Sequence, residues 1–327
     1  MRKSAAVLLV VGLVGAASLS GQGGPPPIAK SPPDTFAPDI PGVVAAGTRV
    51  RLIRDLFQST EGAIAMPDGS LLFTEQDADD GQLVKIDKDD NISVHLTNTN
   101  RTIGLGYDHK GRLLAAQSRI PRIAVLEPTR TTLAGEFEGV PLVFPNDLTI
   151  DRRGGIYFDD QLQTRFRPVP AGRDKPIIFY ITPEGKLLKV SDEVRSPNGI
   201  TLSVDEKTLY VTNGPEIVKF DVQPDGTLRN MRTHATLVGL RRNEQGQVQG
   251  GSDSICIDND GRIYSTTPVG VQVFGPDGQH LGTIPTPLPP QSVAFAGPEK
   301  KTLYIVGRGA VYKVGPMLAQ GIKTRAK

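Results

Sequence analysis

A hairpin pattern that recurs six times between Thr48 and Gly315 limits the possible folds of this 327-residue chain more than any other feature. Each copy is an apolar run of about five residues, a turn containing Gly, Asp or Lys, and a second apolar run, which is typical of paired antiparallel strands. The central turns lie 40 to 54 residues apart, and one four-stranded propeller blade needs about 40–50 residues. The copies are Gly62–Glu75, Gly104–Gln117, Asp147–Asp160, Gly199–Asn213, Ser254–Thr267 and Ser292–Val306.

Further hairpins between these copies give four strands per repeat, as in residues 83–94, 177–188, 218–228 and 271–281. After Ala310–Val314 the last repeat lacks its outer strand, and the segment Gly47–Arg54 can supply it. Such pairing closes the ring and removes an exposed sheet edge. The sequence therefore predicts an all-β, six-bladed β-propeller over residues 47–316, closed by an N-terminal strand that joins the last blade. Two separate β-sandwiches would not explain six copies at blade spacing.

The two ends of the chain have a different composition from the repeats. Residues 1–22 have a positive start, an apolar run and small residues, the layout of a signal peptide, and the apolar run is short for a membrane span. We expect a periplasmic or secreted protein with no membrane span after cleavage; an uncleaved anchor is the alternative. Residues 23–46 are rich in Pro and Gly and are predicted to be an extended tether without a core. Residues 317–327 are predicted to be a basic tail, frayed at its end.

Charge and cysteine content exclude several classes of protein. A formal net charge of +2 and the lack of a basic-aromatic run argue against nucleic acid as a partner. The single cysteine excludes an intrachain disulfide, and its place between Ile255 and Ile257 predicts a buried apolar side chain. We expect a monomer. The four histidines fall in turns or outer strands and are predicted to be solvated: His95, His109, His234 and His280.

The residue before the first strand of each repeat is polar in five of the six copies. If that strand is the innermost of its blade, these residues all line one mouth of the ring. Two carboxylates and several amides form an all-oxygen set, which suits one divalent cation, Ca²⁺ first, with Mg²⁺, Mn²⁺ or Zn²⁺ as alternatives. Asn and Asp are also common turn formers, so each alone has a structural explanation. The six positions are Glu61, Ile103, Asn146, Asn198, Asp253 and Gln291.

Several of these positions lie in segments that resemble one known family. Phe144–Asp160, Ser196–Val211 and Gly250–Gly261 are similar, in order, to segments of the senescence-marker-protein/gluconolactonase family, and Thr60–Ala63 resembles its opening segment. The resemblance covers Thr48 to Val314. It implies a six-bladed propeller with one axial divalent cation. It also implies that the metal ligands are Glu61, Asn198 and Asp253, and that an additional active-site asparagine is Asn146.

The chain departs from the family pattern around this set. Many members carry Asn where this chain has Ile103 and Gln291, animal-type members carry Arg where it has Phe144, and Gln117-Ser118 replaces a frequent Glu-His pair. The metal set is therefore intact, while the expected substrate-contacting residues are altered. We assign substrate binding to Asn146, Phe144, Ile103 and Gln291.

The function expected from these residues is the opening of a lactone, a sugar lactone or a related cyclic ester. The cation would polarise the carbonyl, Asp253 would position or deprotonate the attacking water, and Asn146 would orient the substrate. One alternative is a phosphotriesterase-like hydrolase that uses the same metal set. A second alternative is a non-catalytic periplasmic propeller in which the ion is structural.

Overall fold

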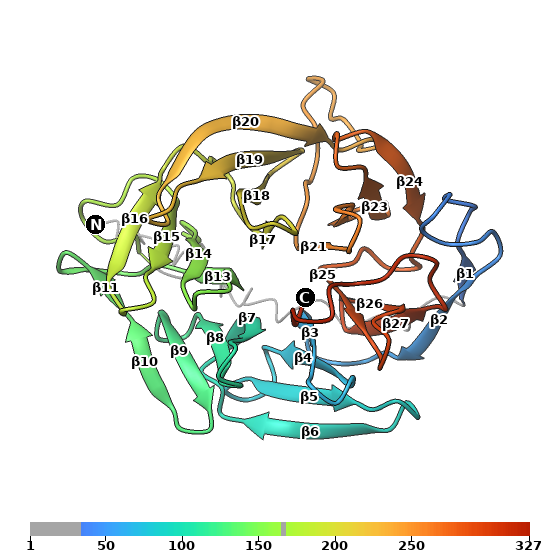
Figure 1. The fold of residues 1–327 in the computed structure, drawn as a ribbon, viewed down its shortest axis with the longest axis horizontal. Coiled ribbons are helices and arrows are strands. Elements are labelled where there is room, and N and C mark those ends of the chain that lie inside the picture. Colours follow the sequence, from blue (N-terminus) through green and yellow to red (C-terminus); the bar gives the residue numbers. More distant parts are fainter. Residues whose placement is uncertain (1–33, 165–167) are drawn as a thin grey trace, which may run out of the picture.

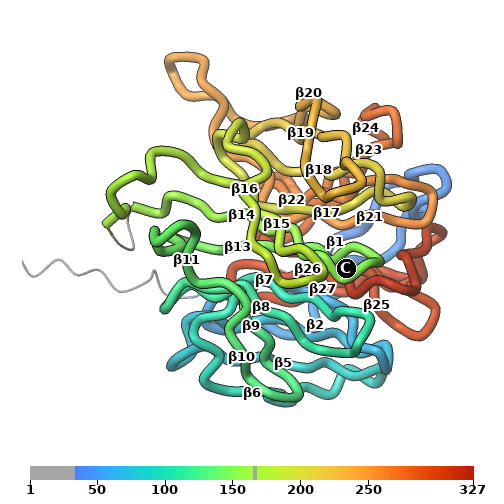
Figure 2. The backbone as a smooth tube through the Cα atoms, turned by 60° about the vertical axis from the view of Figure 1, so that its left-hand side comes forward, coloured from blue at the N-terminus to red at the C-terminus, as the bar shows by residue number. Residues whose placement is uncertain are grey.

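The chain forms a ring of six antiparallel sheets around a common axis in the computed structural model, which describes residues 34–164 and 168–327 (Figure 1). Within these ranges the secondary structure consists of strands, and the first strand of each repeat is the innermost of its blade. Figure 2, turned by 60° from that view, shows the blades following one another around the ring from blue to red. The predicted six-bladed propeller is confirmed.

The strands of the first five blades follow the repeats in order. The first blade contains β3 (Thr60–Ala65), β4 (Leu71–Glu75), β5 (Gln82–Ile86) and β6 (Ile92–Thr97). The second contains β7 (Thr102–Tyr107), β8 (Leu113–Gln117), β9 (Arg122–Glu127) and β10 (Thr131–Ala134), and a small hairpin of β11 (Glu136–Phe137) and β12 (Val140–Pro141) follows it. The third contains β13 (Pro145–Ile150), β14 (Ile156–Asp160), β15 (Ile177–Ile181) and β16 (Leu187–Ser191). The fourth contains β17 (Ile200–Leu202), β18 (Thr208–Asn213), β19 (Glu216–Val222) and β20 (Leu228–Thr236). The fifth contains β21 (Ile255–Ile257), β22 (Ile263–Thr267), β23 (Gly270–Phe274) and β24 (His280–Ile284).

The sixth blade joins the two ends of the ring, as predicted. It is built from β25 (Ser292–Ala296), β26 (Thr302–Gly307) and β27 (Ala310–Val314), and β2 (Arg49–Arg54) pairs antiparallel with β27. The short β1 (Thr35–Phe36) adds a fifth strand. The described part of the expected tether is therefore packed, and that prediction was wrong for residues 34–46. Four apolar residues in it are buried against the sixth blade: Ala37, Ile40, Val43 and Val44.

The basic tail is also ordered against the ring, contrary to the expectation of a frayed end. Met317 and Ala319 are each 2% exposed, and Gly321 forms a bridge with Asp258 of the fifth blade. Arg325 donates hydrogen bonds of 2.6 and 2.7 Å to the carbonyl oxygens of residues 202 and 203. The tail binds because it supplies donors to carbonyl groups at the end of an inner strand, where the sheet offers none. Figure 1 places the C-terminal end near the axis of the ring.

The remaining predictions about the chain have mixed outcomes. Cys256 is buried and unpaired, as expected. His234 is only 8% exposed, so the prediction that all four histidines are solvated was wrong. Residues 1–22, the expected signal peptide, and residues 23–33 lie outside the described residues. The part of the chain that the structure describes contains no helix long and apolar enough to cross a bilayer.

Candidate functional site

The mouth at which the inner strands begin is held in shape by residues at the end of each second strand. The Asp160 carboxylate at the end of β14 accepts hydrogen bonds from the backbone N–H groups of Val143, at 3.0 Å, and Phe144, at 2.6 Å. At the end of β18, Asn213 Oδ1 accepts two 3.1 Å bonds from the backbone of residues 195 and 196. These bonds satisfy loop backbone that strand pairing leaves without partners. They fix the loops that lead to Asn146 and Asn198.

Four of the sequence-predicted residues lie together at this mouth. Glu61, on β3, is 8% exposed, and its Oε1 accepts a 2.7 Å hydrogen bond from Gln291 Nε2. The backbone carbonyl of Gln291 accepts a 3.2 Å bond from Ser254, the neighbour of Asp253. The Asn198 amide lies close enough to the Asp253 carboxylate to lower its pKa through hydrogen bonding.

Asn146 lies on β13 and is partly exposed. It directly precedes Asp147, whose carboxylate charge acts on both Glu61 and Asp253. Asn146 is therefore the sequence neighbour of an acid whose charge reaches this group of four residues. The roles assigned to all five residues stay predictions.

The pKa values of both carboxyl groups of the site are raised, mainly by burial. Burial raises the pKa of Glu61 well above its usual range, the charges of Asp253 and Asp147 raise it further, and the Gln291 hydrogen bond opposes them. Burial also raises the pKa of Asp253, to about 7, against the opposing charge of Arg308. Buried carboxylates close to one another are stable as anions when a cation compensates them.

A third acid, Asp147, already has such a cation from the chain. Its side chain forms an ion pair with the Lys327 ammonium, and both groups are largely buried. Its backbone N–H is fixed by a 2.7 Å bond to Asp159 Oδ1. Glu61 and Asp253, in contrast, have neutral amide partners. Sequence reasoning missed this ion pair, since Asp147 directly follows Asn146 but its partner comes from the tail.

The donor set fits a divalent cation. Two carboxylates balance a charge of +2, and the Asn198 carbonyl oxygen adds a donor of the kind that Ca²⁺ and Mg²⁺ prefer. Among the residues described, no three His, Cys, Asp or Glu side chains gather as a metal cluster. Amide oxygens would therefore have to complete the coordination provided by the two acids.

The predicted substrate-binding residues have different surroundings. Ile103 and Phe144 are each 4% exposed and form a small apolar cluster with Val143. Both ends of the Gln291 amide are engaged, since Oε1 accepts a 2.8 Å bond from the Arg308 backbone while Nε2 bonds to Glu61. Gln291 therefore braces Glu61, and a substrate contact would have to replace one of these bonds.

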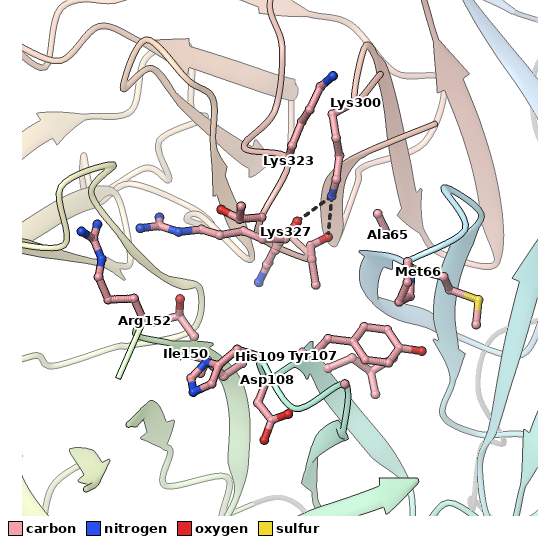
Figure 3. Close-up of a pocket in the computed structure, with 18 of the residues that line it drawn as sticks. Ala65, Met66, Tyr107, Asp108, His109, Ile150, Arg152, Lys300, Lys323 and Lys327 are labelled. Carbon is pink, nitrogen blue, oxygen red and sulfur yellow. Dashed lines mark hydrogen bonds between the residues drawn. The ribbon is translucent and has the colours of Figure 1, made fainter. Parts of the chain in front are cut away.

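A cavity of about 770 Å³ lies at the opposite mouth of the ring, where the first hairpin turns meet the tail. Figure 3 shows Met66, Tyr107, His109 and Arg152 around it, with the Lys300 ammonium bonded to carbonyl groups of the tail. Because β3 begins near Glu61 and ends near Met66, this cavity and the candidate site are at opposite ends of the inner strands. The cavity therefore opens at the other end of the axis, and Lys327, which lines it, pairs with Asp147.

The fold and this mouth define a class of protein: a six-bladed propeller with acids and amides of several inner strands gathered at one end of its axis. A family model described as "SMP-30/Gluconolactonase/LRE-like region" matches residues 59–308. The chain belongs to this family.

Individual relatives are distant but cover most of the chain. The gluconolactonase of Zymomonas mobilis is 26% identical over 307 residues, covering 85% of this chain and 84% of the relative. The structure of a gluconolactonase from Xanthomonas campestris superposes with a TM-score of 0.73 at 27% identity, covering 89% of this chain and 99% of that one. A calcium-binding protein, regucalcin, from Agrobacterium tumefaciens shares the fold with a TM-score of 0.67 at 17% identity, over 84% of this chain and 96% of that one.

Proposed function

We propose that this chain hydrolyses lactones at the mouth that contains Glu61, Asn198 and Asp253. The observation that carries the proposal is the pair of acids, Glu61 and Asp253, held by amide partners at this mouth. The names of the relatives support the reaction: gluconolactonases from Zymomonas mobilis and Xanthomonas campestris, and a lactonohydrolase from Aspergillus oryzae.

Glu61, Asn198 and Asp253 would hold one divalent cation in this proposal. Calcium is our first choice, because the donors are all oxygen atoms and because a relative of the same fold is described as calcium-binding. When bound, the cation would polarise the lactone carbonyl and stabilise the negative charge that develops on its oxygen.

The chain's own side chains supply the remaining chemistry. Asp253 accepts a proton from the attacking water, whose oxygen forms a bond to the carbonyl carbon. The ring C–O bond then breaks, its oxygen takes up a proton, and the product is a hydroxy acid. Asn146 orients the substrate by donating from its amide. Gln291 keeps Glu61 in place through the 2.7 Å hydrogen bond to Oε1.

The test is lactone opening followed by proton release, corrected for spontaneous hydrolysis. We expect EDTA treatment to abolish the activity, Ca²⁺ to restore it, and Asp253→Asn to lower kcat at least about a hundredfold. Asp225→Asn is the matched control, because Asp225 lies in an exposed turn and its carboxylate bonds to Thr227. Activity that survives both Asp253→Asn and metal removal would contradict the proposal.

Two parallel measurements separate the alternatives. An aryl phosphotriester offered as substrate distinguishes a phosphotriesterase from a lactonase on the same metal set. A folded, metal-loaded protein that opens no ester of any kind would favour the non-catalytic propeller.

A further inference from the structure

An arginine occupies a backbone position in the sixth blade that the local structure disfavours. Gly307 and Ala310 are the last paired residues of β26 and β27, so Arg308 and Gly309 form a two-residue turn between them. Their φ angles are +53° and +79°, which identifies a type I′ turn, for which Asn-Gly is strongly preferred. A residue with a Cβ atom at such a φ costs roughly 1–2 kcal/mol. The turn itself therefore gives no reason for an arginine.

The turn reaches the same mouth as the candidate site. Second strands end at the mouth where inner strands begin, because the two are antiparallel. The backbone N–H of Arg308 donates to Gln291 Oε1 at 2.8 Å, and Gln291 Nε2 donates to Glu61 Oε1 at 2.7 Å. A single amide therefore connects the base of the arginine to one of the two acids. The guanidinium charge also lowers the pKa of both Glu61 and Asp253.

The guanidinium group of Arg308 differs from the other cations near this mouth. Arg173 is buried and pairs with Asp160 at 2.7 Å, and Lys327 pairs with Asp147. The side chain of Arg308 is exposed, and its guanidinium forms no hydrogen bond or ion pair with any residue that the structure describes. It is therefore a rigidly anchored, unpaired cation at the rim of the site.

We propose that Arg308 determines substrate specificity by binding a carboxylate that the lactone carries outside its ring. A guanidinium matches a carboxylate with two parallel N–H···O bonds, and such charge-assisted pairs are strong. The inference rests on the proposed lactone hydrolysis and adds the substrate class, an acidic lactone. Strain kept at one position is common where a side chain serves a ligand.

The test compares a neutral and an acidic lactone of similar size, glucono-δ-lactone and glucaro-1,4-lactone. We expect the wild-type chain to prefer the acidic lactone. Arg308→Asn should lower kcat/KM for that lactone at least about tenfold more than for the neutral one, as expected for a lost charge-assisted bond. Both lactones share the effect of the lost charge on Glu61 and Asp253, so the ratio isolates the substrate contact. Arg308→Lys should recover part of the loss, because it keeps the charge without the two-pronged geometry. Arg229→Asn, on the outermost strand of the fourth blade, removes an exposed arginine as the matched control.

Stability gives an independent check on Arg308→Asn. Since Asn tolerates the positive φ better than Arg, the variant should unfold at the same temperature as the wild type or higher, so a loss of activity would not reflect damage to the fold. Equal losses for both lactones, no loss for either, or a wild type without preference for the acidic lactone would each overturn the inference.

A binding measurement separates failure of this inference from failure of the proposed function. Calorimetric titration with glucarate, a dianion, and gluconate, a monoanion, needs no turnover. If the wild type opens no lactone, the proposed reaction is wrong, and weaker glucarate binding by Arg308→Asn still supports an anion-binding arginine. Equal glucarate binding by wild type and Arg308→Asn would overturn that role.

Discussion

His234 gives a prediction about acid stability that can be worked out from its surroundings. Its ring packs against Tyr210 with centroids 4.8 Å apart, and its two nitrogens are buried without a well-formed hydrogen bond to any described residue. Burial, helped by the Lys219 charge, lowers the pKa of His234 from 6.5 to about 4, while the Gly275 backbone and the Asp277 charge oppose the shift and Arg232 adds to it. The folded protein therefore keeps this histidine neutral under mildly acidic conditions.

The sign of the effect follows from where the proton binds. Between pH 6.5 and pH 4 the unfolded chain binds a proton at His234 and the native protein does not, so the free energy of unfolding falls as the pH falls. The contribution is fully present above pH 6.5. The loss amounts to about 2 kcal/mol at pH 5 and about 3 kcal/mol at pH 4.

The perturbation that tests this is His234→Phe, which keeps a ring against Tyr210 and removes the titrating group. Urea unfolding followed by circular dichroism suits a chain without tryptophan. Between pH 7.5 and pH 5 the wild type should lose about 2 kcal/mol more than His234→Phe. His109→Phe, which changes an exposed histidine, should behave as the wild type. Equal losses for wild type and His234→Phe would refute the reasoning.

Two further predictions concern the packing around the axis. Gly62→Ala should lower the free energy of unfolding by more than about 3 kcal/mol, since φ is +56° and an added Cβ would lie 2.1 Å from the backbone oxygen of Ile103. The control Gly111→Ala has a positive φ but open space around the added Cβ, and should lower it by about 1 kcal/mol. Equal losses for the two variants in urea titrations would contradict the argument. Arg325→Ala should cost about 2–3 kcal/mol, because its guanidinium donates to two strand-end carbonyl groups. Lys323→Ala, which removes an exposed ion pair, should cost less than about 0.5 kcal/mol; a similar melting temperature for these two variants would show that the tail is not anchored by Arg325.

The fold was predictable because the same hairpin pattern occurs six times in the sequence, at intervals that match the length of one propeller blade. Alignment of the six repeats then predicted that four polar residues lie at one mouth of the ring, and the structure brings these four together: Glu61, Asn198, Asp253 and Gln291. Closure by the N-terminal strand followed from the missing outer strand of the sixth blade.

Predictions made from composition or strand position alone were wrong where packing depends on contacts of single residues. Residues 34–46 contain Pro and Gly at turn positions, yet Ile40 and Val44 bridge to each other and are fully buried. His234 lies on an outer strand, where exposure is the rule, but the Gly278 turn of the fifth blade covers it. Lys327 reaches Asp147 across more than half of the sequence. None of these contacts produces a local pattern, so sequence reasoning could not find them.

The two mouths of the ring are chemically different because every repeat runs in the same direction. At the far mouth, aspartates of the first hairpin turns bond to their own turns: Asp108 Oδ1 accepts two backbone bonds of 2.9 Å, and its other oxygen binds Arg112. Asp258 repeats this arrangement with Arg262. At the near mouth, Glu61 and Asp253 precede or begin strands and have no turn of their own to stabilise.

The number of bonds that an acid makes to its own turn therefore separates structural from functional candidates better than residue type does. By this measure Asp108 and Asp258 are needed to shape their hairpins, and replacing either should damage the fold before it changes any ligand site. Burial of the Glu61 and Asp253 carboxylates is unfavourable, and neither carboxylate offsets it by stabilising a turn of its own. Such a cost is understandable at a position that serves a ligand.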